Sequence, residues 1–302
     1  MLGAMTLATL QAGQVPGTVW LLVVLGTAVL LIEFYSAVRS RQWRKLPAAA
    51  ALGLVLPLLL LVLTRWLAPS KPSLFVQVAL SLALVVPLGP MLYRLAFQPI
   101  ANASVLVLLI VAVAVHYAFV GLGLVFFGGE GWRTSPFTDA QIKAGPTVVS
   151  GQSLWVISAA GTLMALLWVF FARTYWGKVL RATAINRIGA RLVGIRTEMA
   201  GKAAFSIAAL LGAFSGVLIA PFTTIYYDSG FLIGLKGFVA TVIGGLVSYP
   251  LAAAGAFLVG VLESFASFWA SALKDAIVFT LLIPFLLWRS AVARHVEEDD
   301  HL

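Results

Sequence analysis

Four ionisable residues lie inside strongly apolar stretches of the sequence: Glu33, His116, Lys236 and Glu263. Charges are expensive inside a bilayer, so each residue is a candidate for a substrate or ion pathway. Each also has a structural explanation. In the structural explanation, Glu33 would pair with Arg39 or reach the membrane interface. His116 would be a neutral imidazole that is hydrogen-bonded to a neighbouring helix. Lys236 and Glu263 form either a structural ion pair or a substrate contact.

The segment around Lys236 is rich in glycine, with Gly234, Gly244 and Gly245 as further pathway candidates. Broken helices in transporters present backbone groups to the charged ends of a substrate. Small residues also let helices approach closely in lipid, where no hydrophobic force drives them together. Segment 230–246 is therefore expected either to supply exposed backbone to a pathway or to pack tightly.

No motif in the sequence predicts an enzyme. The chain has no cysteine, no G-x4-G-K-[ST] phosphate loop and no H-E-x-x-H, and its three histidines are scattered. Thiolate chemistry, a zinc site and direct ATP binding through a phosphate loop are therefore not expected. We predict no catalytic site, no metal site and no cofactor.

The most informative stretch is segment 173–202, which is basic and has helical periodicity. Arg187 and Arg191 lie one turn apart, on a different face of the helix from its apolar residues, and Gly194 marks the end of the helix. The segment either lies on anionic lipid headgroups or docks a cytoplasmic partner. One apolar stripe runs along it at spacings of three or four residues, through Ala182, Ile185, Ile188, Leu192 and Ile195.

The elements that position these residues must be membrane helices. Of the 302 residues, 61% are hydrophobic and only 10% are charged, and the mean hydropathy is +1.02. A soluble domain carries about 25% charged residues, so a soluble globular fold is excluded. We predict an all-α polytopic bundle of about eight or nine spans. The nine candidates are 17–38, 47–67, 74–95, 104–127, 153–172, 203–221, 231–247, 251–270 and 276–288.

The basic residues predict the orientation of the chain. Most lysines and arginines fall in loop 39–46, in segment 173–202 and near the C-terminus, which places these regions in the cytoplasm. It follows that the N-terminus and loop 128–152 lie outside, while tail 289–302 is cytoplasmic. The net charge of +9 is explained by this orientation, so no nucleic-acid partner is expected. The span 231–247 is the weakest, because it is short and contains Lys236.

Residues 177–195, GKVLRATAINRIGARLVGI, resemble the cytoplasmic loop of branched-chain amino acid permeases of the LivH/LivM type. The resemblance continues through LKGFVATVIGGL at 235–246 and KDAIVFTLLIPFLL at 274–287. Upstream, YRLAFQPIANAS at 93–104 is similar to a family stretch of the form Y-R-P-L-R-x-A-S. The similarity extends over residues 93–288 and is closer to the LivH branch than to the LivM branch.

The resemblance implies an inner-membrane permease subunit of a bacterial ATP-binding cassette importer for branched-chain or related amino acids. Its partners would be a second permease subunit, two cytoplasmic ATPases and an extracytoplasmic binding protein. Residues 1–302 would form one permease domain, in which 178–196 is the helix that couples to the ATPase. The implied coupling residues are Arg181, Ala182, Ile185, Arg187, Ile188, Arg191, Leu192, Gly194 and Ile195.

The sequence departs from the family in its first 100 residues. The family carries a stretch similar to G-x-x-N-F-A-H-G-E-F-Y, and residues 17–60 hold only a faint similarity at Glu33-Phe34-Tyr35. The substrate therefore stays open between branched-chain amino acids, other amino acids, amides and urea. An alternative function is a stand-alone secondary transporter that uses Glu33, Glu263 and His116 for ion coupling. A further one is a non-transporting assembly subunit with a lipid-binding loop.

Overall fold

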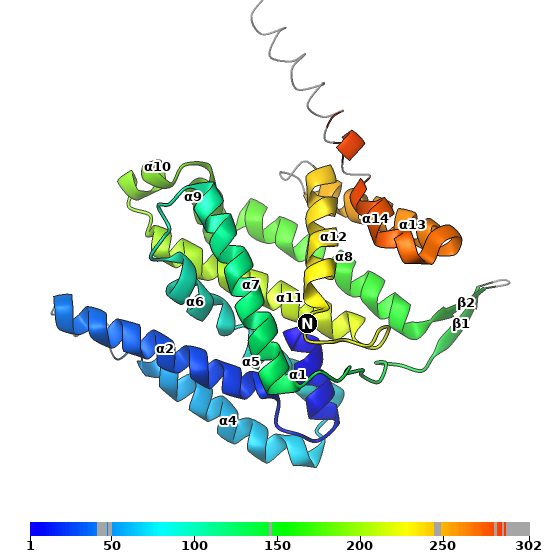
Figure 1. Cartoon of the computed structure of the whole chain (residues 1–302), viewed down its shortest axis with the longest axis horizontal. Helices are drawn as coiled ribbons and strands as arrows, with labels where there is room; N and C mark the ends of the chain where they lie inside the picture. Colours follow the sequence, from blue (N-terminus) through cyan, green and yellow to red (C-terminus); the bar gives the residue numbers. More distant parts are fainter. Residues whose placement is uncertain are drawn as a thin grey trace, which may run out of the picture. The chain divides into compact units, whose positions relative to one another are not determined.

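The computed structural model contains two compact units, Met1–Asp228 and a second that begins at Ser229. Figure 1 shows that the secondary structure of the described residues is helical apart from one β-hairpin. The predicted all-α membrane-spanning class is thereby confirmed. The structure describes residues 1–40, 47, 50–144, 147–244, 249–280, 283–285 and 287.

The elements of the first unit follow the chain in this order: α1 Leu2–Gln11, α2 Gly17–Ser40, η2 Ala51–Val55, α4 Leu56–Leu67, η3 Ala68–Ser70, α5 Leu74–Val85, α6 Leu88–Leu92, η4 Tyr93–Phe97, α7 Val105–Phe127, β1 Gln141–Ala144, β2 Thr147–Ser150, α8 Gly151–Arg173, α9 Tyr175–Ile185, α10 Arg187–Leu192 and α11 Thr197–Ile219. The second unit contains α12 Gly230–Ile243, α13 Tyr249–Ala270, η5 Ser271–Leu273 and α14 Lys274–Thr280.

The helical stretches agree with the first six predicted spans. Within the described residues, seven stretches are long and apolar enough to cross a membrane: Gly17–Arg39, Ala51–Ser70, Leu74–Phe97, Leu106–Phe127, Gly151–Arg173, Thr197–Ile219 and Pro250–Phe285. The predicted eighth and ninth spans fall together in the last of these. In that stretch the short helix η5 separates α13 from α14.

The predicted seventh span is shorter in the structure than expected. Helix α12 has 14 residues, so it extends about 21 Å at 1.5 Å per residue. The hydrocarbon core of a bilayer is about 30 Å thick. The residues of α12 alone therefore do not cross it, and residues 245–248 of the predicted span lie outside the described part of the chain.

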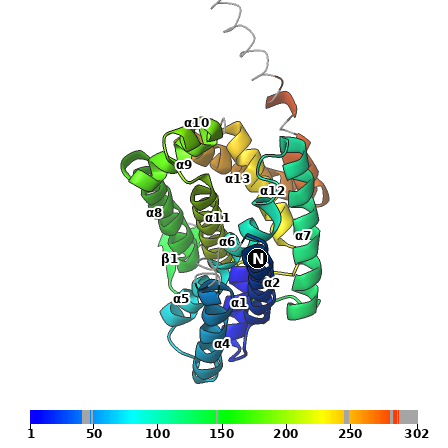
Figure 2. The ribbon, with the colours of Figure 1, turned by 90° about the vertical axis from the view of Figure 1, so that its left-hand side faces the viewer.

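Helix α1 is buried, although no span was predicted before residue 17. Leu7 is fully buried, and the Thr9 hydroxyl donates to the Met5 carbonyl at 3.0 Å, so the helix satisfies its own polar groups. Figure 2 shows α1 among the other helices of the first unit, and it contacts α5 and α11. Its ten residues are too few for a span-length pattern, which is why span counting missed it.

Glycine lets α1 lie directly against α11. A Cβ atom added at Gly3 would lie 2.4 Å from the carbonyl oxygen of Ala213, inside van der Waals contact. The Gly3 carbonyl in turn accepts a hydrogen bond of 2.8 Å from the Ser81 hydroxyl on α5. Close backbone approach of this kind stabilises helix pairs in lipid.

The stretch from α5 to η4 is interrupted twice. Pro87 lacks a backbone N–H and stands between α5 and α6. After α6 the chain widens into the π-helix η4, where the Gln98 N–H donates to the Tyr93 carbonyl at 2.7 Å. Single π turns of this kind occur often at functional sites.

The two ends of α8 carry different structures. The hairpin of β1 and β2, paired from Gln141 with Ser150 to Ala144 with Thr147, leads into its N-terminal end. Helix α9 follows its C-terminal end, and Figure 1 shows α9 and α10 far from the hairpin. Helix α8 has 23 residues and so extends about 35 Å, the thickness of a membrane. This separation agrees with the prediction that the two loops face opposite sides.

Candidate functional site

The basic segment that was predicted as one amphipathic helix is two helices, α9 and α10. Asn186 separates them with an extended backbone at φ −146° and ψ 99°. Its side-chain oxygen accepts the Gly189 N–H at 2.8 Å and caps α10. Asparagine is among the best residues at this position, because its side chain satisfies an N–H that the helix itself leaves unpaired. The prediction of a single continuous helix is wrong at this residue.

The apolar stripe of this segment is exposed at its centre. Ile185, Ile188 and Leu192 are 86%, 74% and 84% exposed, and Val193, which the periodicity did not single out, is 77% exposed. Ala182 and Ile195, at the ends of the stripe, are half-buried. We call Ile185, Ile188, Leu192 and Val193 the apolar tip.

Arg187 and Arg191 turn toward the body of the unit, away from the apolar tip. Arg187 Nη1 donates to the backbone carbonyl of Ala101, and Arg191 Nε donates to the Thr197 hydroxyl at 3.1 Å. Ala190 between them is buried. Both hydrogen bonds therefore hold α10 in place, although only Arg187 is half-buried, and Arg191 is exposed like Arg181 on α9.

Gly194 ends α10 by adopting a left-handed backbone with φ of +85°. The Ile195 N–H then bonds back to the Ala190 carbonyl at 2.9 Å, which satisfies a carbonyl at the helix end. Glycine adopts this conformation at little cost because it has no Cβ atom. The structure thus agrees with the prediction that Gly194 marks the end of the helix.

Glu33 pairs with Arg94, and not with Arg39 as the sequence suggested. Arg94 Nε lies 2.5 Å from Glu33 Oε1, and the two side chains are 18% and 14% exposed. The pair joins α2 to η4 across 61 positions of sequence. No local spacing pattern could have found it, because the two helices come together only when the unit folds.

In the second unit, Lys236 and Glu263 form the predicted ion pair and a third charge joins them. Lys236 Nζ lies 2.5 Å from Glu263 Oε1 and 2.8 Å from Asp275 Oδ1. The lysine therefore bridges α12, α13 and α14. Asp275 was missed because it stands at the start of a predicted span, where a charge has an ordinary interfacial explanation.

The glycines of this region differ in their surroundings. Gly234 is exposed, with no heavy atom within 4 Å of an added Cβ, whereas a Cβ at Gly244 would lie 2.4 Å from the Ala252 nitrogen on α13. Gly244 thus serves close packing, whereas Gly234, inside α12, has open space beside its Cα atom. Gly245 lies outside the described residues.

His116 lies on α7 and is half-buried. Its ring centroid is 5.4 Å from that of Tyr117 in a tilted arrangement. Most of α7 is exposed, and only 6% of the residues in its most apolar stretch are buried. His116 therefore belongs to a helix that faces lipid or another subunit. Within the described residues, no cluster of three His, Asp or Glu side chains could hold a metal ion.

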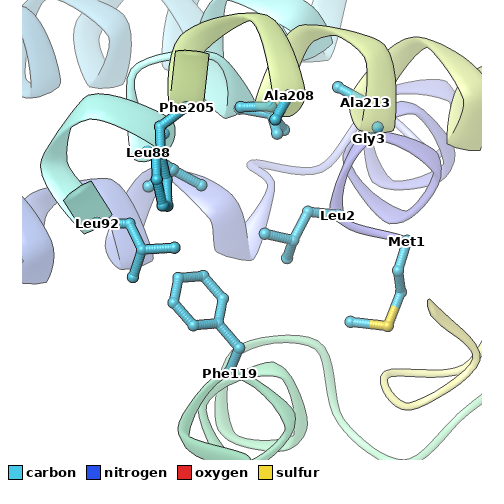
Figure 3. A pocket seen from close by; sticks show the side chains of 13 residues that line it. Met1, Leu2, Gly3, Leu88, Leu92, Phe119, Phe205, Ala208 and Ala213 are labelled. Atoms are coloured by element: carbon cyan, nitrogen blue, oxygen red, sulfur yellow. The ribbon is translucent and has the colours of Figure 1, made fainter. Parts of the chain in front are cut away.

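An apolar cavity of about 380 Å³ opens in the first unit. Figure 3 shows Leu92 on α6, Phe119 on α7 and Leu2 on α1 pointing into it, with Phe205 and Ala208 of α11 on another side. None of the predicted pathway residues lines this cavity. Its lining comes from five helices, α1, α5, α6, α7 and α11, which are drawn from across the first unit, so sequence patterns gave no sign of it.

Comparison with known proteins identifies relatives of the chain. The high-affinity branched-chain amino acid transport system permease protein LivH of Escherichia coli K12 is 29% identical over 214 residues, 64% of this chain and 65% of LivH. BraD of Pseudomonas aeruginosa, a permease protein with the same description, is 29% identical over 219 residues, 70% of this chain and 71% of BraD. The autoinducer 2 import system permease protein LsrC of Escherichia coli O9:H4 is 30% identical over 178 residues, 57% of this chain and 48% of LsrC.

The matched part of the chain spans just under two thirds of the length of LivH. No solved structure matches the chain. The family model described as the branched-chain amino acid transport system permease component matches residues 1–286. The chain is therefore a multi-pass membrane protein that belongs to the branched-chain amino acid transport permease family.

Proposed function

We propose that this chain is a permease subunit of an ATP-driven importer in the bacterial inner membrane. It would pair with a second permease subunit and receive branched-chain or related amino acids from an extracytoplasmic binding protein. Two separate cytoplasmic ATPases would supply the energy. The chain itself would carry out no covalent chemistry, and its task would be to open a pathway to one side of the membrane at a time.

The observation that carries this proposal is the apolar tip of α9 and α10. Its side chains stand in a basic segment, at the end of α8 opposite the hairpin, and they are exposed by more than 70%. A helix that lies on headgroups carries its apolar side chains along one face, whereas this segment is broken at Asn186 into two short helices with exposed apolar side chains around the break. A short apolar projection of this kind suits a groove on a partner protein.

The ion pairs argue against a stand-alone carrier. Such a carrier needs carboxylates that exchange a coupling ion during transport. Glu33 is held by Arg94, and Glu263 is held by Lys236. Both carboxylates are neutralised by fixed cations of the same chain, which favours a structural role for them and an external source of energy.

The proposal is tested by co-purification of the ATPase with the full chain in mild detergent. The variant Ile188→Glu/Leu192→Glu places two charges on the apolar tip, and we expect ATPase binding to weaken by about a hundredfold or more, the loss expected when two large apolar side chains no longer bury. These positions are better than the arginines, since Arg187 and Arg191 hold α10 in place.

The matched control is Val148→Glu, which charges an exposed valine on β2 at the opposite end of α8. It should retain the ATPase at the wild-type level. An ATPase that stays bound to the Ile188→Glu/Leu192→Glu variant would refute docking at the tip. A wild-type chain that captures no ATPase in several detergents would refute the importer.

A further inference from the structure

Arg187 links α10 to a part of the chain that lies 86 positions earlier. Its guanidinium donates to the carbonyl of Ala101, in the turn between η4 and α7. Ser104 ends this turn by capping α7, where its hydroxyl accepts the Val107 N–H. The contact therefore fixes the short coupling helix to the entry of a 23-residue membrane helix.

The same guanidinium lies beside the hydroxyl of Tyr93, the first residue of η4. The Tyr93 ring packs directly on α11, where a Cβ atom added at Gly201 would overlap it. The next residue, Arg94, holds Glu33 of α2. One π turn thus meets α10, α11 and α2, and Arg187 is the contact that α10 makes to it.

Two polar atoms at this junction lack hydrogen-bond partners among the described residues. They are Arg187 Nε, a donor, and Gln98 Oε1, an acceptor, and both are buried. Gln98 stands in the same turn as Ala101, whose carbonyl already accepts a hydrogen bond from Arg187. The backbone carbonyl of Gln98 accepts a hydrogen bond from the Ala101 N–H at 3.4 Å. Buried groups without partners cost free energy, so an arrangement that joins these two atoms would be favoured. The junction therefore has chemistry for a second hydrogen-bonded state.

We propose that Arg187 is a positioning residue of the transport cycle, which carries movement of α10 directly to η4 and to the start of α7. The inference rests on the proposed function, because it needs an ATPase that moves α10. Movement of α10 can also reach α8 and α11 along the chain itself. The Arg187 contact adds a second route for this movement, to η4 and α7. In this route the donor Arg187 shifts between the Ala101 carbonyl and the Gln98 side chain.

The test measures whether α7 responds to the ATPase. The chain contains no cysteine, so Leu106→Cys at the start of α7 and Val62→Cys on α4 can carry spin labels at exposed positions. The labelled chain is assembled with the ATPase, and the distance between labels is measured by pulsed EPR without nucleotide and with ATP and vanadate. We expect a shift of about 2 Å or more, the scale of helix movements in switching proteins.

In Arg187→Gln the shift should fall below detection while the ATPase remains bound. The matched control is Arg173→Gln, which removes an exposed positive charge at the end of α8 and should leave the shift unchanged. A shift that persists in Arg187→Gln would overturn the proposal. Loss of the ATPase from this variant would overturn it too, because it would show that Arg187 serves docking, either directly or by holding α10 in place. A wild-type chain whose α7 does not shift would overturn it as well.

A second variant covers the case in which Arg187→Gln does not fold. Arg187→Lys keeps one cationic donor for the Ala101 carbonyl but loses the buried Nε donor that the proposed exchange with Gln98 uses. We expect it to keep the ATPase and to shift less than the wild type, and a full shift would overturn the exchange with Gln98. If the wild type binds no ATPase at all, the proposed function fails first, which separates that failure from this one.

Discussion

At the scale of single residues, two groups of partly buried charges among the described residues are held by partners from other helices. Glu33 and Arg94 come from α2 and η4, and Lys236 holds Glu263 and Asp275 from two further helices of the second unit. Removing both partners of a buried pair is often neutral, whereas removing one leaves a charge without compensation. These ion pairs are therefore expected to affect stability mainly when one partner is removed, because the other charge is then left without compensation.

The Glu33–Arg94 pair gives a direct prediction. Arg94→Gln leaves Glu33 uncompensated, and we expect a loss of about 3 kcal/mol in the free energy of unfolding, the lower end for a broken buried pair. The double variant Glu33→Gln/Arg94→Gln should recover most of it. Thermal unfolding in detergent measures both, and a double variant as unstable as the single one would show that the charges themselves are not the cause.

At the scale of elements, the first unit is built around a helix too short to cross a membrane. Helix α1 fills the space between α5 and α11, and it lies close because Gly3 has no side chain. Helices α7 and α8 differ from α1, because only 6% and 0% of the residues in their most apolar stretches are buried. Their outer surfaces are left for lipid or for a second subunit.

The packing of α1 can be tested with a pair of glycine variants. Gly3→Val would place a Cβ atom 2.4 Å from the Ala213 carbonyl, so α1 and α11 must separate, and we expect a large fall in the yield of folded protein. Gly121→Val on α7 makes the same change where no heavy atom lies within 4 Å of the added Cβ. It should fold normally, and equal yields from the two variants would contradict the close packing.

At the scale of the whole molecule, the basic residues and α8 together predict the orientation. Segment 173–202 is rich in lysine and arginine and stands at one end of α8, and the hairpin stands at the other. The positive-inside rule places the first in the cytoplasm and the second outside. The exposed apolar tip then faces the compartment that holds the ATPase of the proposed importer.

Labelling from each side checks this orientation, because the native chain has no cysteine to interfere. Val148→Cys in the hairpin should react with a maleimide that does not cross membranes when it is added to spheroplasts. Lys178→Cys on α9 should react only after the membrane is opened. The reverse pattern would place the apolar tip outside and remove the proposed ATPase contact.

The membrane class, the first six spans and the basic segment with its apolar stripe could all be predicted from the sequence. These features depend on local composition and on helical periodicity, which neighbouring residues determine by themselves. The pairing of Lys236 with Glu263 was also predicted, since two opposite charges in apolar surroundings have few other ways to lower their cost.

Only the tertiary structure decided which residues meet across the fold. It gave Glu33 the partner Arg94, added Asp275 to Lys236, buried α1 and turned Arg187 toward Ala101. Each of these contacts depends on how separate helices pack, and nothing in the local pattern of one helix encodes the neighbour it will have. The sequence therefore determined what the helices are, and packing determined which side chains remain to bind a partner.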